Sequence, residues 1–271
     1  MQHLLDTPAG RARLDQAVAD RLLCAFDFDG TLAPLVSRPE EARLPEATRE
    51  QLQALQRHVP VAIITGRAIA DIAPRLGFKP DILIGNHGLE GVPGVHAAAL
   101  AEEHQRVCKA WRLQLEELLS AEYPDPRIQV EDKTYSLSVH YRHAQAAQRA
   151  ERELASLLAA LDPAPRLVAG KCVFNVMPPG AGNKGSALLQ TMEEIGALQA
   201  LYAGDDVTDE DVFRLGHPSI LAVRIEFSTR SAAPYFLKEL MEMNALLHAV
   251  CARLSSCNAR NWLRTPDHAS N

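Results

Sequence analysis

The sequence lacks the marks of membrane proteins, secreted proteins and nucleic-acid binders. Its 271 residues contain no apolar run close to the ~20 residues that a membrane helix requires, so we expect no membrane partner. Residues 1–23 are charged throughout and lack the apolar centre of a signal peptide. Lys and Arg number 28 against 34 Asp and Glu, which gives a net charge of −6, and they form no basic block. We therefore expect no nucleic-acid partner either.

Cysteine is also scarce, and its pattern argues against a disulfide scaffold. The five cysteines are odd in number and show no C-x-x-C pair, which favours a reducing cytoplasm over disulfide bonds or a zinc site. Hydrophobic residues make up 47% and charged residues 23%, a composition typical of globular proteins and not of disordered chains. The length allows one or two domains, or one core with an inserted module. We expect a cytoplasmic monomer.

Short apolar runs recur along the chain and indicate buried strands. Each is apolar on both faces, as expected for a parallel sheet that is covered on both sides. Helical patterns at 45–57, 68–76 and 209–215 alternate with these runs. This βαβ alternation predicts an α/β fold with a doubly wound parallel sheet. The predicted core strands cover residues 22–28, 59–65, 81–86, 198–205 and 220–225.

The middle third of the chain has a different pattern. Helices are predicted at 102–120 and 144–161, and apolar and polar residues alternate in 127–133, 134–142 and 166–178. Such alternation is typical of an antiparallel sheet with one face uncovered. We expect an α+β module, inserted between the third and fourth core strands, whose helices cover the apolar face. The predicted polar face carries Gln129, Glu131, Lys133, Ser136, Ser138, His140, Arg142 and Asn175, and the predicted apolar face carries Ile128, Val130, Tyr135, Leu137, Val139, Tyr141, Phe174 and Val176.

Two acidic residues directly follow the first predicted strand. Period-2 alternation places Asp27 and Asp29 on one side of the chain, with Phe28 turned away. They lie at the carboxyl end of a parallel strand, where open α/β sheets bind ligands, and Gly30 permits a tight turn there. Two carboxylates this close require a cation or a shared proton. Taken alone, the pair fits a ligand site and a solvated turn equally well.

A second acidic group follows the fourth predicted core strand, in residues 204–210. Asp205 and Asp206 are expected at the same edge of the sheet as the first pair. Oxygen ligands from two strand ends suit Mg²⁺, which keeps several waters and is completed by substrate phosphate. Asp209 and Glu210 fit the first turn of a helix, where the macrodipole favours acidic groups, and spacing alone favours that interpretation for these two.

Two further segments could bind an anion. Thr65-Gly66-Arg67 ends the second predicted strand and opens a helix, where a hydroxyl and free backbone N–H groups form an anion cradle. Thr65 also fits a plain helix N-cap, and the two roles are compatible. Lys184 precedes the helix predicted at 186–195 and could neutralise a phosphate, although a surface lysine at a helix start is commonplace.

The glycines around this lysine allow a different interpretation. Gly180, Gly182 and Gly185 match G-x-G-x-x-G, with Asp205 following 20 residues after the last glycine, as in a dinucleotide-binding fingerprint. Two prolines separate the preceding strand from the first glycine, and that strand alternates like an antiparallel one; both observations argue against the fingerprint. A nucleotide-binding oxidoreductase or sensor is therefore the alternative from another functional class.

The motifs occur in an order known from one superfamily. DFDGT (27–31), ITGR (64–67), a glycine-flanked lysine and GDD (204–206) resemble the haloacid dehalogenase superfamily of phosphotransferases. Within it, residues 22–235 are similar to the trehalose-6-phosphate phosphatase family. The resemblance implies a haloacid-dehalogenase-like core over 1–98 and 179–271 and an inserted α+β cap over 99–178. The segments that carry the closer resemblance are NHGLE (86–90), VEDKTYSLSVHYR (130–142), GKCVFNVMP (170–178), NKG (183–185) and GDDVTDED (204–211).

The resemblance also implies a role for each matching residue. Asp27 is expected to be the nucleophile that forms an aspartyl phosphate, and Asp29 the acid toward the sugar oxygen and then the base for water. Mg²⁺ is the expected cofactor, held by Asp27, by the backbone carbonyl of Asp29 and by Asp205. Thr65 and Lys184 are expected to hold the phosphoryl oxygens. The other substrate contacts that the resemblance implies are Thr31, Gly66, Arg67, Asn86, His87, Glu131, Lys133, His140, Arg142, Asn175, Asp206 and Asp209.

The implied substrate is a small sugar phosphate, trehalose 6-phosphate. Sucrose-phosphate and mannosyl-glycerate-phosphate phosphatases share the core motifs and are the alternatives within the superfamily. Asn175 stands where the family usually has a glutamate that binds a sugar hydroxyl. Arg224-Ile225-Glu226 stands where a glycine-containing turn is expected. The polar segment 255–271 is predicted to be a frayed tail.

Overall fold

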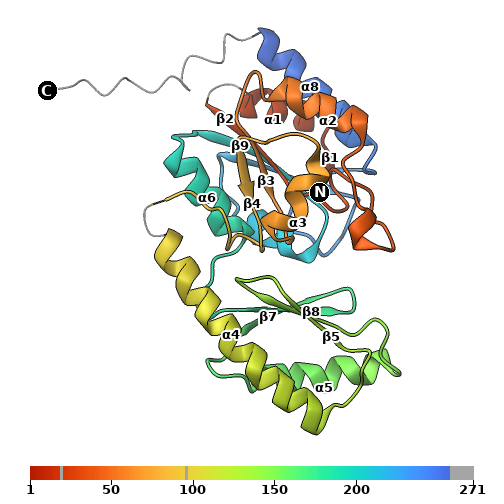
Figure 1. The fold of residues 1–271 in the computed structure, drawn as a ribbon. Coiled ribbons are helices and arrows are strands. Elements are labelled where there is room, and N and C mark those ends of the chain that lie inside the picture. Colours follow the sequence, from red (N-terminus) through yellow and green to blue (C-terminus); the bar gives the residue numbers. More distant parts are fainter. Residues whose placement is uncertain (19–20, 95–96, 257–271) are drawn as a thin grey trace, which may run out of the picture.

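The computed structural model describes residues 1–18, 21–94 and 97–256, which form two lobes, each built on one β-sheet (Figure 1). The larger lobe, which we call the core, holds a seven-stranded sheet in the order β1-β11-β10-β9-β2-β3-β4. Every pairing in this sheet is parallel, which confirms the predicted α/β fold. Its strands are β1 (Gln2–His3), β2 (Leu22–Phe26), β3 (Val61–Ile64), β4 (Ile82–Ile84), β9 (Gln199–Gly204), β10 (Ile220–Ile225) and β11 (Tyr235–Leu237).

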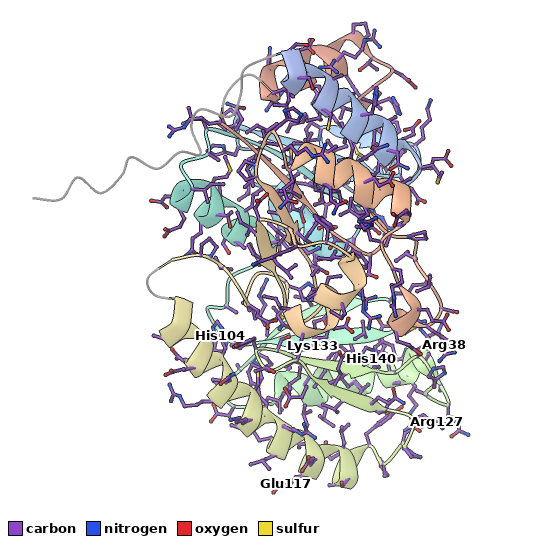
Figure 2. The ribbon with its side chains drawn as sticks, turned by 45° about the horizontal axis from the view of Figure 1, so that its top comes forward. Arg38, His104, Glu117, Arg127, Lys133 and His140 are labelled. Carbon is purple, nitrogen blue, oxygen red and sulfur yellow. The ribbon has the colours of Figure 1, made fainter. Side chains whose placement is uncertain are left out.

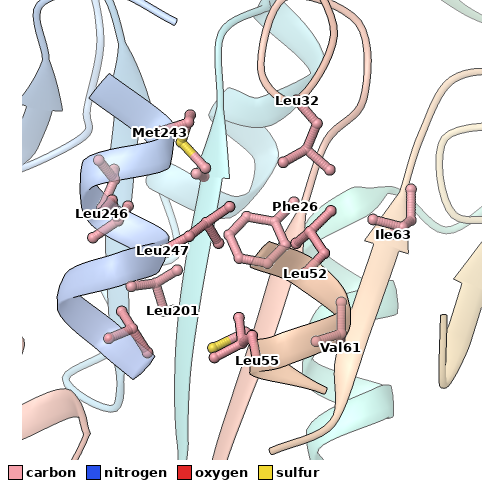
Figure 3. Close-up of a cluster of buried hydrophobic side chains, with 14 of the residues drawn as sticks. Phe26, Leu32, Leu52, Leu55, Val61, Ile63, Leu201, Met243, Leu246 and Leu247 are labelled. Atoms are coloured by element: carbon pink, nitrogen blue, oxygen red, sulfur yellow. The ribbon is translucent and has the colours of Figure 1, made fainter. Parts of the chain in front are cut away.

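Helices cover both faces of the core sheet, because successive side chains of each strand enter different hydrophobic clusters. On β2, Leu22, Cys24 and Phe26 belong to one cluster, and Leu23 and Ala25 belong to the other. Helices α1, α2, α3 and α8 pack on the first face, part of which Figure 3 shows around Phe26, and α6 and α7 pack on the second. The helices are α1 (Pro8–Ala17), α2 (Glu46–Leu55), α3 (Ile69–Leu76), α6 (Lys184–Glu194), α7 (Glu210–Phe213) and α8 (Glu242–Ser256), with short 3-10 helices at Pro39–Glu41 and Val207–Asp209.

The strand order brings the predicted motifs together. Strand β2 lies between β9 and β3, and all three run in the same direction. Asp27 directly follows β2, Thr65 directly follows β3 and Asp205 directly follows β9. Because parallel strands end at the same edge of a sheet, these three residues meet although they are far apart in the sequence.

The smaller lobe, which we call the inserted lobe, has an antiparallel sheet in the order β5-β6-β8-β7. Its apolar face packs against two helices around the buried side chains of Trp111, Leu137 and Leu154, as the alternating pattern predicts. Tyr135 lies outside the lobe's hydrophobic cluster, so its predicted position on that face is wrong; the backbone leaves the strand geometry at Thr134, where φ is +73°. The elements are α4 (Ala97–Glu122), β5 (Gln129–Asp132), β6 (Leu137–His140), α5 (Ala147–Ala159), β7 (Arg166–Gly170) and β8 (Val173–Met177).

The glycine-rich segment before α6 does not have the geometry of a dinucleotide fingerprint. Strand β8, which precedes it, belongs to the antiparallel sheet and pairs with β6 and β7. The fingerprint requires a parallel strand that turns directly into a helix. The dinucleotide-binding alternative is therefore wrong.

The two ends of the chain contain elements that the sequence patterns did not identify. Strands β1 and β11 have only 2 and 3 residues, which is too short for an alternating pattern. The predicted frayed tail is wrong for its first two residues, because α8 continues to Ser256. Residues 257–271 of that tail lie outside the described residues. Among the described helices, none is both long and apolar enough to cross a membrane.

Candidate active site

The carboxyl edge of the core sheet holds a compact acidic cluster. Asp27 is 4% exposed, and its backbone N–H donates to the carbonyl of Ala203 on the neighbouring strand, at 2.9 Å. Carboxylate oxygens of Asp27, Asp205 and Asp209 all lie within 4.8 Å of one another. The structure thus brings together the first and second acidic groups that the sequence predicts at this edge.

A buried lysine lies in the middle of this cluster. Lys184 is 2% exposed, and its Nζ donates to Asp27 Oδ1 and to Asp209 Oδ1, each at 2.8 Å. It is the first residue of α6, whose N-cap Asn183 accepts a hydrogen bond from the backbone N–H of Ser186. The cap fixes the start of the helix, and the helix start fixes the lysine. Lys184 is therefore not a surface lysine.

Asp209 is buried and its acceptor capacity is used. Its Oδ1 accepts from Lys184 Nζ and from Tyr202 Oη, and its Oδ2 accepts from the backbone N–H groups of Asp205 and Asp206. Four donors fill the lone pairs of a carboxylate, and the residue is 0% exposed. The structure therefore gives Asp209 no access to a substrate and makes it the support of Lys184 and of the 205–206 loop. Sequence reasoning did not single out Tyr202; a phenol inside an otherwise apolar strand was the available signal.

The charges in this cluster do not balance. Burial, with the nearby carboxylates of Asp209 and Asp205, raises the pKa of Asp27 well above its usual range, even though Lys184 acts in the opposite direction. Burial and the charge of Asp209 raise the pKa of Asp205 to about 7. Burial disfavours the ammonium of Lys184, but the charges of Asp209 and Asp27 outweigh it and raise the pKa of that lysine. Three carboxylates facing one ammonium group fit a site that receives a divalent cation.

Two residues of the DFDGT motif hold Asp205 in place. Thr31 is 0% exposed and its hydroxyl donates to Asp205 Oδ1 at 3.1 Å, so the structure ties this predicted substrate contact to the acidic cluster. Gly30 has φ +79°, and a Cβ there would lie 2.2 Å from Asp205 Oδ2. A glycine is required both for the turn and for the close approach of the carboxylate.

The Thr65-Gly66-Arg67 loop borders the acidic cluster. Thr65 is 1% exposed and its hydroxyl accepts from the N–H of Arg67 at 3.2 Å. The Arg67 guanidinium binds both carboxylate oxygens of Asp29, at 2.6 and 2.7 Å, and also binds Asp71 at 2.7 Å. Asp71 was not identified from the sequence; it lies in the first turn of α3, and Arg67 lies just before that helix. In this structure the Arg67 guanidinium is thus paired with the carboxylates of Asp29 and Asp71.

His87 and Asn175 face each other above this loop. A Cβ on Gly66 would lie 2.3 Å from His87 Cε1, so the imidazole packs directly on that glycine. Burial lowers the pKa of His87 well below its usual range, the nearby charges of Lys133 and Lys184 lower it further, and the Asn175 side chain interacts with it. The hydroxyl of Ser138 donates to Asn175 Oδ1 at 2.8 Å. Asn175 thus reaches the site from the inserted lobe with its oxygen already bound.

Asn86 is buried and occupied. It is 0% exposed, its Nδ2 donates to Glu90 Oε2 and to the carbonyl of Lys133, and its Oδ1 accepts from Ser136 Oγ. The expected contact of Asn86 with a sugar stays a prediction, and in this structure both polar atoms of its side chain already have partners. The reason is that the inserted lobe lies directly against Asn86.

The other predicted contacts, apart from Asp206, lie on or beside the polar face of the inserted lobe. Lys133 lies where the two lobes meet (Figure 2), and its Nζ donates to the carbonyl of Gly66 at 3.2 Å. Glu131 and His140 are half-exposed and pair with each other at 2.9 Å. Arg142 follows β6 and is exposed, and Asp206 is an exposed N-cap on the core. Of these, only Lys133 bonds to the loop beside the acidic cluster in the described contacts.

A non-glycine residue, Glu226, forms the turn after β10 where a glycine was expected, and its backbone adopts the conformation that is typical of glycine. Glu226 has φ +65°, the left-handed conformation that glycine adopts most readily. Arg224 pairs with Glu210 at 3.5 Å, and Glu210 also accepts from the N–H of Ala232 at 2.9 Å. The edge of the site is therefore closed by an ion pair beside a turn that a non-glycine residue occupies.

Comparison with known proteins follows the same motifs. A sequence model of the family described as Trehalose-phosphatase matches residues 25–240. The trehalose-phosphate phosphatase of Mycobacterium tuberculosis H37Rv is 33% identical over 229 residues, a match that covers 80% of this chain and 57% of that protein. This chain therefore spans less than two thirds of the length of that relative.

Solved structures share the fold. The C-terminal domain of the Candida albicans trehalose-6-phosphate phosphatase aligns with a TM-score of 0.66 at 21% identity, over 93% of this chain and 98% of that one. A trehalose-6-phosphate phosphatase related protein aligns with a TM-score of 0.66 at 23% identity, over 85% of this chain and 97% of that one. At these identities the likeness concerns the fold alone.

Proposed function

Because the chain belongs to the trehalose-phosphatase family of the haloacid dehalogenase superfamily, we propose that it hydrolyses trehalose 6-phosphate to trehalose and phosphate in a Mg²⁺-dependent reaction. The observation that carries this proposal is the buried Lys184, which lies between Asp27 and Asp209 at the carboxyl edge of the sheet. An ammonium group beside a nucleophilic carboxylate suits the transfer of a phosphoryl group, whose transition state spreads negative charge over its oxygens.

The proposed reaction divides into two displacements on Asp27. A carboxylate oxygen of Asp27 attacks phosphorus, the bond from phosphorus to the sugar oxygen breaks, and Asp29 gives that oxygen a proton. Water then attacks the aspartyl phosphate, Asp29 takes a proton from the water, and phosphate leaves with Asp27 regenerated. Each displacement has a lower barrier than direct hydrolysis, which is among the slowest uncatalysed reactions.

Arg67 must change partner during this cycle. It binds both oxygens of Asp29 in this structure, and the proposed reaction needs the same carboxylate group at the leaving oxygen of the sugar. The substrate phosphate is a competing anion that enters beside the 65–67 loop. Exchange of Arg67 from Asp29 to the phosphate would leave Asp29 free to serve the leaving oxygen.

The acidic cluster fits Mg²⁺ by its donor set. Asp27 and Asp205 offer hard oxygen ligands, and the raised pKa values of both express an excess of negative charge that a cation would relieve. The carboxylate of Asp209 already accepts four hydrogen bonds. We therefore assign the ion to Asp27, to Asp205 and to the backbone carbonyl of Asp29. A bound Mg²⁺ would neutralise phosphoryl oxygens and let the dianion approach the carboxylates.

We propose that the inserted lobe is the cap that selects the sugar, with the cap over 99–178 and the core over 1–98 and 179–271. Its polar face is directed at the core, and Lys133 and Asn175 reach the site from it. Glu131, paired with His140, lies nearer the rim and offers carboxylate oxygens to sugar hydroxyls. A site built to bind hydroxyls rejects substrates that leave its buried polar groups unpaired.

The function is tested with a panel of phosphate esters in the presence of Mg²⁺, measured as release of inorganic phosphate. We expect trehalose 6-phosphate to give the highest kcat/KM, above sucrose 6-phosphate, mannosyl-glycerate phosphate and p-nitrophenyl phosphate. Asp27→Asn should abolish turnover on all of them, because an amide is a poor nucleophile. Preference for another sugar phosphate would refute the substrate, and substantial turnover by Asp27→Asn would refute the covalent route.

The proposed setting is a cytoplasmic monomer. Four cysteines in the described part of the chain are free, which suits a reducing compartment. Light scattering coupled to gel filtration tests the oligomeric state, and a mass of twice 29.7 kDa would contradict it.

A further inference from the structure

Three of the hydrogen bonds between the two lobes lie close together and involve Asn86, Lys133, Ser136 and Gly66. Asn86 of the core donates from Nδ2 to the carbonyl of Lys133 at 3.0 Å and accepts at Oδ1 from the hydroxyl of Ser136 at 3.2 Å. In the opposite direction, Lys133 Nζ donates to the carbonyl of Gly66 at 3.2 Å. We call these three bonds the latch. They connect the 132–136 turn of the inserted lobe to two loops of the core, the one that follows β3 and the one that follows β4.

Two of the three side chains in the latch, Asn86 and Ser136, are inaccessible to solvent. Asn86 and Ser136 are each 0% exposed, and the third polar bond of Asn86 is made to Glu90 within the core, at 2.8 Å. Buried polar groups are stable only with partners, so Asn86 and Ser136 require each other as long as the lobes stay together. When the lobes separate, water can replace both partners, because the groups are neutral and close to the interlobe surface.

The backbone of Asn86 is itself hydrogen-bonded to the 65–67 loop. Its N–H donates to the carbonyl of Arg67 at 2.8 Å, and the next N–H, of His87, donates to the carbonyl of Thr65 at 2.9 Å. Asn86 has φ +50°, a left-handed conformation that asparagine tolerates better than most residues. This conformation sets the Asn86 side chain at the interlobe boundary while its backbone stays on the 65–67 loop.

We propose that Asn86 and Ser136 are positioning residues. They hold the inserted lobe closed on the active site and thereby hold Lys133 against the 65–67 loop. This inference rests on the proposed function and adds to it a closure device that needs no substrate. The two bonds between Asn86 and the inserted lobe join neutral groups, so they stabilise the closed form without the desolvation cost of a buried ion pair. Closure favours the substrate that uses the polar face of the inserted lobe, and matters little for one that does not reach it.

Two variants remove the latch in different ways. Ser136→Ala deletes one hydroxyl and leaves the backbone unchanged. Asn86→Gly deletes the whole side chain and accepts the positive φ without strain. The matched control is Thr48→Val, because Thr48 is also buried and its hydroxyl donates to an amide oxygen, Asn244 Oδ1 at 3.1 Å, inside the core.

The readouts are kinetics on two substrates and hydrogen exchange. We expect Ser136→Ala and Asn86→Gly to lower kcat/KM for trehalose 6-phosphate about tenfold, mainly through KM, which is the loss expected for one net hydrogen bond of the closed form. Activity on p-nitrophenyl phosphate should change less than about twofold. Amide exchange in residues 132–138 should accelerate in both variants, and Thr48→Val should change neither kinetics nor that exchange.

Two results would overturn the latch. One is a lower melting temperature in Ser136→Ala with unchanged kcat/KM and unchanged exchange in 132–138, which would make the hydroxyl a packing group only. The other is an equal loss on both substrates without faster exchange. Failure of the proposed function is a separate result: the unaltered protein would hydrolyse none of the esters, while the exchange comparison, which needs no turnover, would still decide on the latch.

Discussion

Asp209→Asn changes one atom of a buried side chain and should destabilise the core severely. The carboxylate accepts from Lys184 and Tyr202 on one oxygen and from two backbone N–H groups on the other. An asparagine amide keeps the shape but can accept on one side only. Its NH₂ group would face either the two N–H groups or the ammonium of Lys184, and both arrangements oppose donor to donor.

The size of the effect follows from the burial. Removing one partner of a buried ion pair costs about 3–5 kcal/mol, which is a large part of the ~5–15 kcal/mol by which a domain is stable. Lys184 keeps its bond to Asp27, so we expect the lower half of that range, about 3–4 kcal/mol. With a urea m value of about 3 kcal/mol/M, the unfolding midpoint should fall by about 1 M.

The assay is urea unfolding followed by circular dichroism, in chelator so that bound metal does not add stability. Asp206→Asn is the matched control, because Asp206 is exposed and serves as an N-cap, a role that asparagine fills equally well. The control should shift the unfolding free energy by less than about 0.5 kcal/mol. Equal midpoints for the two variants would refute the assignment of Asp209 as a buried support.

Other expectations concern the metal, the motif turn and the inserted lobe. Chelation should stop phosphate release and Mg²⁺ should restore it, and Asp205→Ala should raise the Mg²⁺ concentration for half-maximal activity at least about tenfold; full activity in excess chelator would contradict the metal site. Gly30→Ala should abolish activity because its Cβ would lie 2.2 Å from the carboxylate of Asp205, whereas Gly180→Ala, with a similar φ but open space, should leave kcat within about twofold. Trp111→Phe removes a buried hydrogen bond to the carbonyl of Pro163 and should lower the stability of the inserted lobe by about 1–3 kcal/mol; an unchanged melting temperature would argue against that bond.

Much of the architecture is readable from the sequence because it is local. A strand between two apolar layers is apolar at every position, as in β2, and a strand with one polar face alternates, as in β6. These patterns identified the parallel core, the inserted antiparallel sheet and the acidic strand ends. They could not identify β1, a two-residue edge strand, or β11, the three-residue strand that pairs with it.

Roles within the site depended on partners that the sequence does not specify. Asp209 has the spacing of a surface residue in a first helical turn, and only the packing of α6 turns it toward Lys184. Asn86 lies in a motif that resembles a substrate site, but Ser136, which is 50 residues away, occupies its side chain.

The sequence by itself determined which residues are ionisable and where the longer core strands end, because periodicity and motif order are properties of neighbouring residues. Only the tertiary structure decided which polar groups bind one another and which face the proposed substrate site. The physical reason is that a buried polar atom must find a partner, and the partners of Asp29, Asp209 and Asn86 come from other elements, brought close by strand order and by the packing of the inserted lobe.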